Sequence, residues 1–267
     1  MFTSSTVWLT LGFLTVYWSG VLGQAKTKCD IPSHLWCDTA ETAALCSVTK
    51  YCQKYNRTVA DKKIKLTLFY ETLCPDCQQF TVNTLYPVVW NNLAKIIDLE
   101  LVPYGNAREI VNPNGTRSYQ CQHGAVECSL NLLHACFIRK YPDPADHFPF
   151  VHCMEEKLYK GGETPDQITK ECFQARAIPT ETQHEITQCQ QGSEGQVLQH
   201  QMAQRTAAAW PQAHRFVPWI LINDLSTIAA QMFQQVLDQL LCQTYRGSQP
   251  PGYCQIFQTD VTHPTCG

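Results

Sequence analysis

The hydrophobic pattern of the chain changes character at residue 64. Apolar side chains alternate with other residues over the segment that starts at Ile64 and ends at Tyr70, which is typical of a strand. Apolar residues at helical spacing follow from Phe80 to Ile97, and we expect Pro87 in their middle to kink that helix. The segment LELVPY, residues 99–104, predicts a second strand. Strand, helix and strand make a βαβ unit, which favours a parallel pair joined by a right-handed crossover.

Two more segments complete the predicted core. Residues 105–215 are rich in cysteine and broken by Pro and Gly, which indicates a disulfide-bonded helical insertion. FVPWILIN, residues 216–223, predicts a strand that follows Pro218. STIAAQMFQQVLDQLLCQTY, residues 226–245, predicts one amphipathic helix. Its expected core side chains are Ile228, Met232, Val236, Leu240 and Leu241.

The ends of the chain are organised differently. Residues 1–23 form an apolar stretch that ends in small residues, which predicts a signal peptide; a signal anchor is the alternative. Residues 24–56 hold four cysteines and resemble a saposin A-type module, although they are too short for a lipid-binding bundle, so we favour a propeptide or docking segment. The main domain is then 57–245, and 246–267 is an irregular tail that we expect proteases to trim.

Composition points to the secretory pathway. The chain has 267 residues and 15 cysteines, far more than a cytosolic domain normally carries. Asn56 and Asn114 each begin an Asn-X-Thr acceptor for glycosylation. The net charge of −3 provides no basic field for nucleic acid, and no later segment is apolar and long enough to span a membrane.

The sequence LCPDCQQF, residues 73–80, places Cys74 and Cys77 where the first strand meets the following helix. The N-terminus of a helix stabilises a thiolate, and Pro75 fits the first helical turn. We therefore expect Cys74 to be the exposed nucleophile and Cys77 the buried resolving thiol of a redox pair. Pro218, opening a later strand, is a candidate cis-proline that presents backbone to a substrate chain.

The cysteine pair has two other interpretations, a structural ring and a zinc site. A purely structural CxxC ring does not require a strand before it and a helix after it, whereas a redox motif does, so the context favours the redox interpretation. A zinc site would use a second set of ligands, for which the candidates are Cys121, His123, Cys128 and Cys136, but their spacing does not repeat a CxxC. We therefore predict no metal site.

A longer motif carries a family resemblance. CQHGAVECSLNLLHAC, residues 121–136, matches the signature CQHGxxECxxNxxxxC of the gamma-interferon-inducible lysosomal thiol reductase family, and residues 64–245 resemble that family. The resemblance implies a thioredoxin-like α/β fold with a helical insertion, a redox pair at Cys74 and Cys77, a cis-proline at Pro218 and mostly structural signature cysteines. The roles of Gln122, His123, Gly124, Glu127 and Asn131 are left open.

The resemblance also implies a function, which is reduction of protein disulfides in acidic endosomes or lysosomes, aiding unfolding, proteolysis and antigen processing. Disulfide-bonded or unfolding proteins would be the partners, with secretion as a further destination. No nucleotide-binding glycine motif is present, so we expect no cofactor and small thiols such as cysteine as electron donor. The alternatives are a secretory-pathway oxidase or isomerase, or a secreted, disulfide-bonded binding protein.

Removing the redox pair leaves 13 cysteines, an odd number, so one is free or joins two chains in a disulfide-linked homodimer. Activity in acid requires a lowered pKa at Cys74, which a negative Asp76 would oppose. We hypothesise that protonated His123 or His134 supplies the counter-charge.

Overall fold

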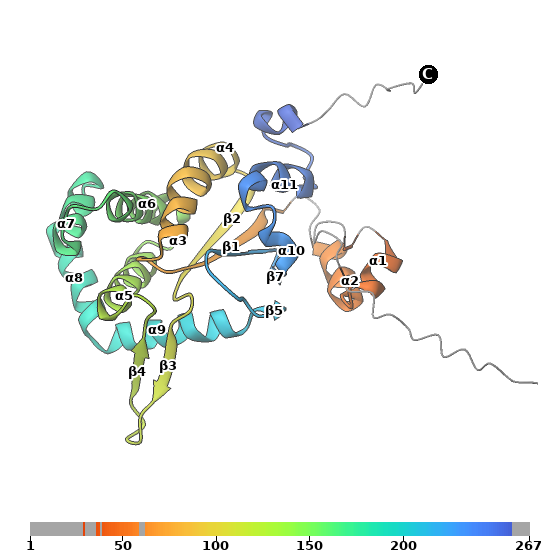
Figure 1. Ribbon diagram of the computed structural model, residues 1–267. Coiled ribbons are helices and arrows are strands. Elements are labelled where there is room, and N and C mark those ends of the chain that lie inside the picture. The colour runs from red at the N-terminus through yellow and green to blue at the C-terminus, as the bar shows by residue number, and fades with distance from the viewer. Residues whose placement is uncertain (1–28, 30–35, 38, 59–61, 258–267) are drawn as a thin grey trace, which may run out of the picture.

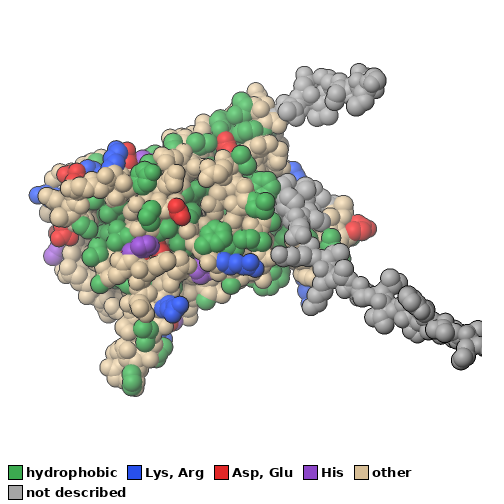
Figure 2. All heavy atoms as spheres, viewed as in Figure 1, with side chains coloured by type: hydrophobic (Ala, Val, Ile, Leu, Met, Phe, Trp, Pro, Cys, Tyr) green, Lys and Arg blue, Asp and Glu red, His purple; other side chains and the backbone are tan. Residues whose placement is uncertain are grey.

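The computed structural model describes residue 29 and residues 36–37, 39–58 and 62–257. The predicted signal peptide at 1–23 and the last part of the tail lie outside this range. Within it, no helix is apolar and long enough to cross a membrane. The face shown in Figure 2 carries scattered Lys and Arg side chains and no continuous basic field.

The predicted βαβ unit is the centre of the fold (Figure 1). Strand β1 (Ile64–Tyr70) pairs in parallel with β2 (Ile97–Pro103). The connection contains α3 (Pro75–Phe80), the π-helical segment η2 (Thr81–Trp90) and α4 (Asn91–Leu93). Pro87 lies inside η2. The helix therefore departs from α-helical geometry at the position where a kink was expected.

The sheet has five strands in the order β2-β1-β6-β7-β5. Strand β6 (Trp219–Ile222) runs antiparallel to β1 and follows Pro218 as predicted. Two-residue strands β7 (Leu225–Ser226) and β5 (Trp210–Pro211) complete the sheet. All four residues of β6 are buried, so this strand joins the main hydrophobic core with β1, β2 and the helices that cover them.

The insertion is mainly helical, as predicted, but it begins with a β-hairpin that the pattern did not reveal. Strands β3 (Arg108–Val111) and β4 (Arg117–Gln120) pair antiparallel and project from the body of the molecule (Figure 1). Their side chains are largely exposed, so no apolar alternation marks them. Five helices follow: α5 (Ala125–Lys140), α6 (Pro144–Lys160), α7 (Pro165–Ala175), α8 (Thr180–Gln191) and α9 (Ser193–Ala207).

The prediction of one amphipathic helix over 226–245 is wrong. The segment forms α10 (Ile228–Gln231), the 3-10 turn η3 (Gln234–Val236) and α11 (Leu237–Thr244). The Gln231 side chain donates to Ile220 O and accepts from Ile220 N, which fixes α10 against β6 before the chain turns away. Met232 and Val236 consequently point outward, 81% and 43% exposed, whereas Leu240 and Leu241 are buried as expected.

Disulfides fasten both ends of the described chain. Near the N-terminus, Cys29–Cys46 and Cys37–Cys52 hold α1 (Ala40–Leu45) and α2 (Thr49–Thr58) around the buried Trp36. The likeness of this part to a saposin A-type module stays a prediction. In the predicted tail, Cys242–Cys254 ties α11 to the 3-10 helix η4 (Gly252–Phe257).

Candidate redox site

Cys74 and Cys77 lie at the start of α3, as the sequence predicted. Cys74 is the N-cap residue, and its sulfur accepts a hydrogen bond from the backbone N–H of Cys77 at 3.4 Å. Pro75 occupies the first helical turn, where its missing N–H costs nothing. Cys77, one turn further, is fully buried. The helix therefore directs a backbone N–H group at the sulfur of Cys74.

These two cysteines carry the only unpaired thiols among the residues that the structure describes. Every other cysteine of that part is in one of six disulfides. Cys266, which completes the fifteen, lies outside the described residues, so the predicted intermolecular disulfide stays a prediction. The fold thus separates structural cysteines from one closely spaced dithiol.

The environments of the two thiols differ in the way that exchange chemistry needs. The pKa of Cys74 is lowered to about 7, chiefly by the hydrogen bond with the Cys77 side chain, with help from the backbone N–H groups of Cys77 and Asp76. Burial and the negative charge of Asp76 oppose this shift. Burial raises the pKa of Cys77 strongly. Cys74 is therefore the thiol that ionises first as the pH rises.

The expectation that Cys74 is exposed is wrong. Its residue surface is only 7% exposed, because the loop before β6 covers it. The sulfur lies 3.8 Å from the backbone oxygen of Val217, and the Val217–Pro218 peptide bond is cis. Pro218 therefore lies beside the dithiol, where the sequence predicted a cis-proline.

A groove of 260 Å³ adjoins this loop. Its lining includes Asp76 and Phe80 from α3 and Phe216 and Pro218 from the loop. The Pro218 carbonyl accepts a hydrogen bond from the Gln234 side chain, so this oxygen already has a hydrogen-bond partner within the fold. Phe216 is 42% exposed, so the groove has an apolar side chain at its surface.

The hypothesis that His134 supplies a positive charge is wrong. His134 is fully buried on α5, and burial lowers its pKa to about 3, so the imidazole stays neutral at the pH of an acidic compartment. Its Nδ1 lies 3.0 Å from the hydroxyl of Tyr70. His134 therefore belongs to the core between the sheet and the insertion.

Glu155 on α6 lies next to His134 in this buried polar region. It is fully buried, 3.8 Å from His134, and neither carboxylate oxygen has a hydrogen-bond partner in the described residues. Burial raises the pKa of Glu155 well above its ordinary value, and the nearby Cys74 adds to the shift. Glu155 is therefore held as the neutral acid close to the redox pair.

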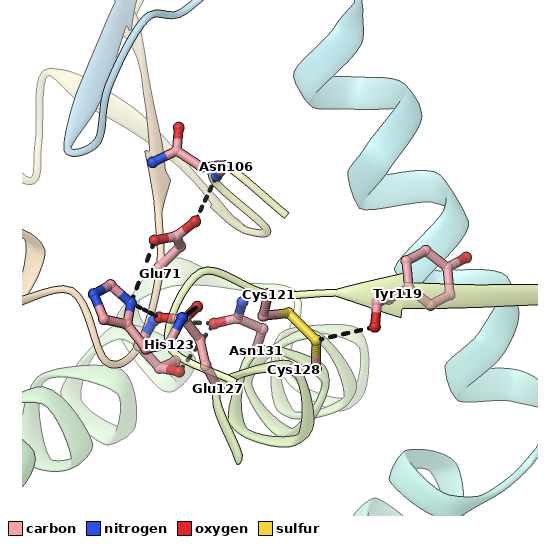
Figure 3. The surroundings of a disulfide bond; sticks show 9 residues. Glu71, Asn106, Tyr119, Cys121, His123, Glu127, Cys128 and Asn131 are labelled. Atoms are coloured by element: carbon pink, nitrogen blue, oxygen red, sulfur yellow. Dashed lines mark hydrogen bonds and ion pairs between the residues drawn. A yellow bond between two sulfur atoms is a disulfide. The ribbon is translucent and has the colours of Figure 1, made fainter. Parts of the chain in front are cut away.

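His123 meets two buried carboxylates (Figure 3). Its Nδ1 lies 2.5 Å from Glu127 Oε2 and 3.8 Å from Glu71 Oε2. Burial and the charge of Glu127 raise the pKa of Glu71 to about 7. Sequence reasoning left Glu127 without a role and did not consider Glu71; the four-residue spacing of His123 and Glu127 on a helix start was the available signal.

Asn131 from the signature holds the segment before the dithiol. Its Oδ1 accepts hydrogen bonds from both the backbone N and the hydroxyl of Thr72, at 3.0 and 2.9 Å. Gln78 on α3 donates to the carbonyl of the same Thr72. Three polar bonds thus fix the backbone two residues before Cys74.

The cysteines of the signature are structural, which removes the four-ligand zinc alternative. Cys121 pairs with Cys128 at the start of α5, and Cys136 joins α5 to Cys189 on α8. Of the two glycosylation candidates, Asn114 is exposed in the β3–β4 turn, where its Oδ1 accepts from Thr116. The side chain of Asn56 lies outside what the structure describes.

Comparison with known proteins shows which family the sequence of this chain resembles. The family described as Gamma interferon inducible lysosomal thiol reductase (GILT) matches residues 65–176. The Gamma-interferon-inducible lysosomal thiol reductase of Carassius auratus is 35% identical over 84% of this chain and 83% of its own length. Its counterpart from Mus musculus is 36% identical over 72% and 71%.

Among solved structures, oxidoreductase DsbA from Xylella fastidiosa aligns with 68% of this chain and 86% of its own, with a TM-score of 0.43 and 14% identity. The family assignment rests on the sequence relatives, which span most of both chains. The chain belongs to the gamma-interferon-inducible lysosomal thiol reductase family and is a thiol oxidoreductase.

Proposed function

We propose that this enzyme reduces disulfide bonds of protein substrates through Cys74 and Cys77. The observation that carries the proposal is the isolation of this dithiol: the twelve other cysteines that the structure describes form six disulfides, while these two are unpaired at a helix start beside Pro218. The pKa of about 7 at Cys74, against a strongly raised pKa at Cys77, supports the assignment of nucleophile and resolving thiol.

The reaction follows thiol–disulfide exchange. The Cys74 thiolate attacks one sulfur of the substrate disulfide, forming a mixed disulfide and releasing the other sulfur as a thiolate that takes up a proton. Cys77 then loses its proton and attacks the sulfur of Cys74, which frees the second substrate thiol. Two electrons pass from the dithiol to the substrate, and Cys74 and Cys77 become a disulfide.

The dithiol must then be regenerated. We propose small thiols such as free cysteine as donors, two molecules of which are oxidised to one disulfide for each turnover. The chain offers no phosphate-binding glycine motif for a nicotinamide or flavin cofactor. The groove of 260 Å³ lined by Asp76, Phe216 and Pro218 would receive either the donor or an extended substrate segment.

We place the activity in acidic endosomes or lysosomes, reached through the secretory pathway, where opening of disulfides would aid unfolding, proteolysis and antigen processing. The names of the relatives support this setting. A pKa of about 7 leaves Cys74 about 1% thiolate at pH 5, some hundred times more than a thiol of pKa 9 would have. Secretion of part of the enzyme, and disulfide-linked dimers, belong to the same proposal.

The test incubates the purified enzyme with a fluorescently labelled, disulfide-bonded protein at pH 4.5 and pH 7.4, with cysteine as reductant. We expect reduction at pH 4.5 that is abolished in Cys74→Ser and arrested as a mixed disulfide in Cys77→Ser. Equal rates in the wild type and in both variants would exclude the reductase and favour a binding protein.

A second measurement separates reductase from oxidase. The dithiol is equilibrated with glutathione redox buffers, and the fraction of oxidised Cys74–Cys77 is determined by alkylation and mass spectrometry. A potential near that of thioredoxin, about −270 mV, supports a reductase, whereas one near about −120 mV supports the oxidase alternative.

A further inference from the structure

Glu71, His123 and Glu127 bring three ligand atoms to one point (Figure 3). One nitrogen and two carboxylate oxygens, one from each residue, all lie within 4.8 Å of one another. They come from separate elements, since Glu71 follows β1, whereas His123 and Glu127 lie at the start of α5.

The second oxygen of each carboxylate is held by the backbone. Glu71 Oε1 accepts from Asn106 N at 2.6 Å, and Glu127 Oε1 accepts from His123 N at 2.9 Å. These bonds turn the remaining oxygens toward the imidazole. Glu71 Oε2 is buried and has no hydrogen-bond partner in the described residues, a situation that a bound group would explain.

The surrounding backbone is shaped around these side chains. Gly105 has a φ of +54°, and a Cβ at this position would lie 2.5 Å from Cγ of Glu71, so the turn can close over Glu71 only with glycine. The Cys121–Cys128 disulfide fixes the loop that carries His123 and Glu127. The three ligands therefore sit on a constrained frame.

We propose that Glu71, His123 and Glu127 bind a divalent transition-metal ion, with Zn²⁺ as the best match. Imidazole nitrogen with carboxylate oxygen is a ligand set that zinc uses, and three protein ligands leave a fourth position for water. Ca²⁺ and Mg²⁺ fit less well because they take oxygen ligands. The proposal replaces the sequence-based expectation of no metal.

The distances are compatible with this ion after small movements. Zinc bonds of about 2.0–2.1 Å in a tetrahedral site place ligand atoms roughly 3.3 Å apart. The distances from His123 Nδ1 to Glu127 Oε2 and to Glu71 Oε2, 2.5 and 3.8 Å, lie on either side of that value. The His123 side chain is 36% exposed, which gives the ion a route from solvent.

The site adjoins the redox pair. The backbone N–H of Cys74 donates to the carbonyl of Glu71 at 3.3 Å. Because a dithiol binds zinc by itself, the test is made in a Cys74→Ser/Cys77→Ser background with the six disulfides intact. Cys266 is retained in every variant, so any contribution from it is the same throughout.

Binding of ZnCl₂ at pH 7.4 is measured by equilibrium dialysis with metal analysis. We expect one Zn²⁺ per chain in the background protein, and an affinity weakened at least about tenfold in Glu71→Gln, His123→Gln and Glu127→Gln. His200 supplies the matched control: it also contacts a carboxylate, Glu109, at 2.7 Å, but it belongs to no three-ligand group among the residues that the structure describes. His200→Gln should bind as the background protein does.

Thermal unfolding gives an independent readout. Zinc that binds the folded state raises Tm, so ZnCl₂ should raise Tm of the background and His200→Gln proteins but not of His123→Gln. His123 is partly exposed, so its variant is expected to fold. No bound zinc in the background protein, or equal binding in all variants, would overturn the proposal and leave His123 and Glu127 as a simple hydrogen-bonded pair.

Discussion

The sulfur of Cys74 lies 3.8 Å from the backbone oxygen of Val217, so the loop before β6 closes directly over the nucleophile. A thiol can donate to that oxygen, whereas a thiolate cannot. Ionisation of Cys74 therefore removes one contact between α3 and the loop at the moment when a substrate must approach. The hydrogen bonds from the first turn of α3 remain and stabilise the charge.

Asp76 opposes this ionisation, and its removal should make Cys74 more reactive in acid. The charge of Asp76 raises the pKa of Cys74, although its backbone N–H lowers it. Asp76→Asn keeps the N–H and removes the charge, so we expect a lower pKa and alkylation of Cys74 by iodoacetamide at pH 5 faster by about two- to tenfold. Gln79→Asn on the same exposed edge is a neutral control; an unchanged alkylation rate in Asp76→Asn would contradict the role of its charge.

Glu155 should make stability depend on pH. Its pKa in the folded state is raised, so folded and unfolded chains both hold the proton below about 4.5, and the unfolded chain loses it first as the pH rises. Its contribution is therefore complete in acid and declines toward neutral pH. Glu155→Gln cannot ionise and should gain stability relative to the wild type, by up to about 1.4 kcal/mol per pH unit.

Urea unfolding at pH 4.5, 5.5 and 6.5 measures this difference. His134, 3.8 Å away, acts with the opposite sign, because its lowered pKa costs stability as the pH falls below about 6.5. Since His134 is present in both proteins, it cancels in the comparison. Parallel stability curves for the wild type and Glu155→Gln would refute a raised pKa at Glu155.

Replacing Asn131 should lower the free energy of unfolding substantially, because its side chain is the acceptor for two buried donors. Asn131→Leu removes the acceptor for two buried donors of Thr72, and each unpaired group costs about 1–3 kcal/mol. Asn92→Ala removes one exposed bond to Val88 O and should stay within about 0.5 kcal/mol. Denaturant unfolding of both variants measures the contrast, and a small effect at Asn131 would mean that water replaces the lost acceptor.

The two disulfides that involve signature cysteines should contribute differently to the free energy of unfolding. Cys136–Cys189 closes a loop of 53 residues and Cys121–Cys128 one of 7. Chain entropy gives about 4 and about 2.4 kcal/mol for loops of these lengths. Paired replacement by alanine, followed by urea unfolding, should therefore destabilise the first variant more. The reverse order would show that folded-state contacts outweigh loop entropy.

Local pattern predicted β1, β2, β6 and the dithiol because these features depend on neighbours in sequence. Alternation placed β1, and the strand-to-helix junction placed Cys74 at its N-cap. The same reasoning failed where distant contacts decide. Met232 follows the helical period yet lies exposed, because Gln231 binds the backbone of β6. His134 looked like a possible cation, but burial against β1 and α6 keeps it neutral.

The signature shows the same limit. Its spacing identified a family but gave no role to Glu127 or Asn131, since their partners Glu71 and Thr72 lie more than fifty residues earlier. Only folding brings the end of β1 onto the start of α5. The hairpin β3–β4 was not predicted because its exposed strands carry no apolar face.

The disulfide between Cys242 and Cys254 bears on how the tail is processed. A protease that cuts after Arg246 would nick the backbone without shortening the molecule, because residues 247–257 stay attached through Cys254. Release of that peptide needs a reductant as well as a protease. Maturation of this end would then report the redox state of the compartment, visible as one band on a non-reducing gel and a smaller one after reduction.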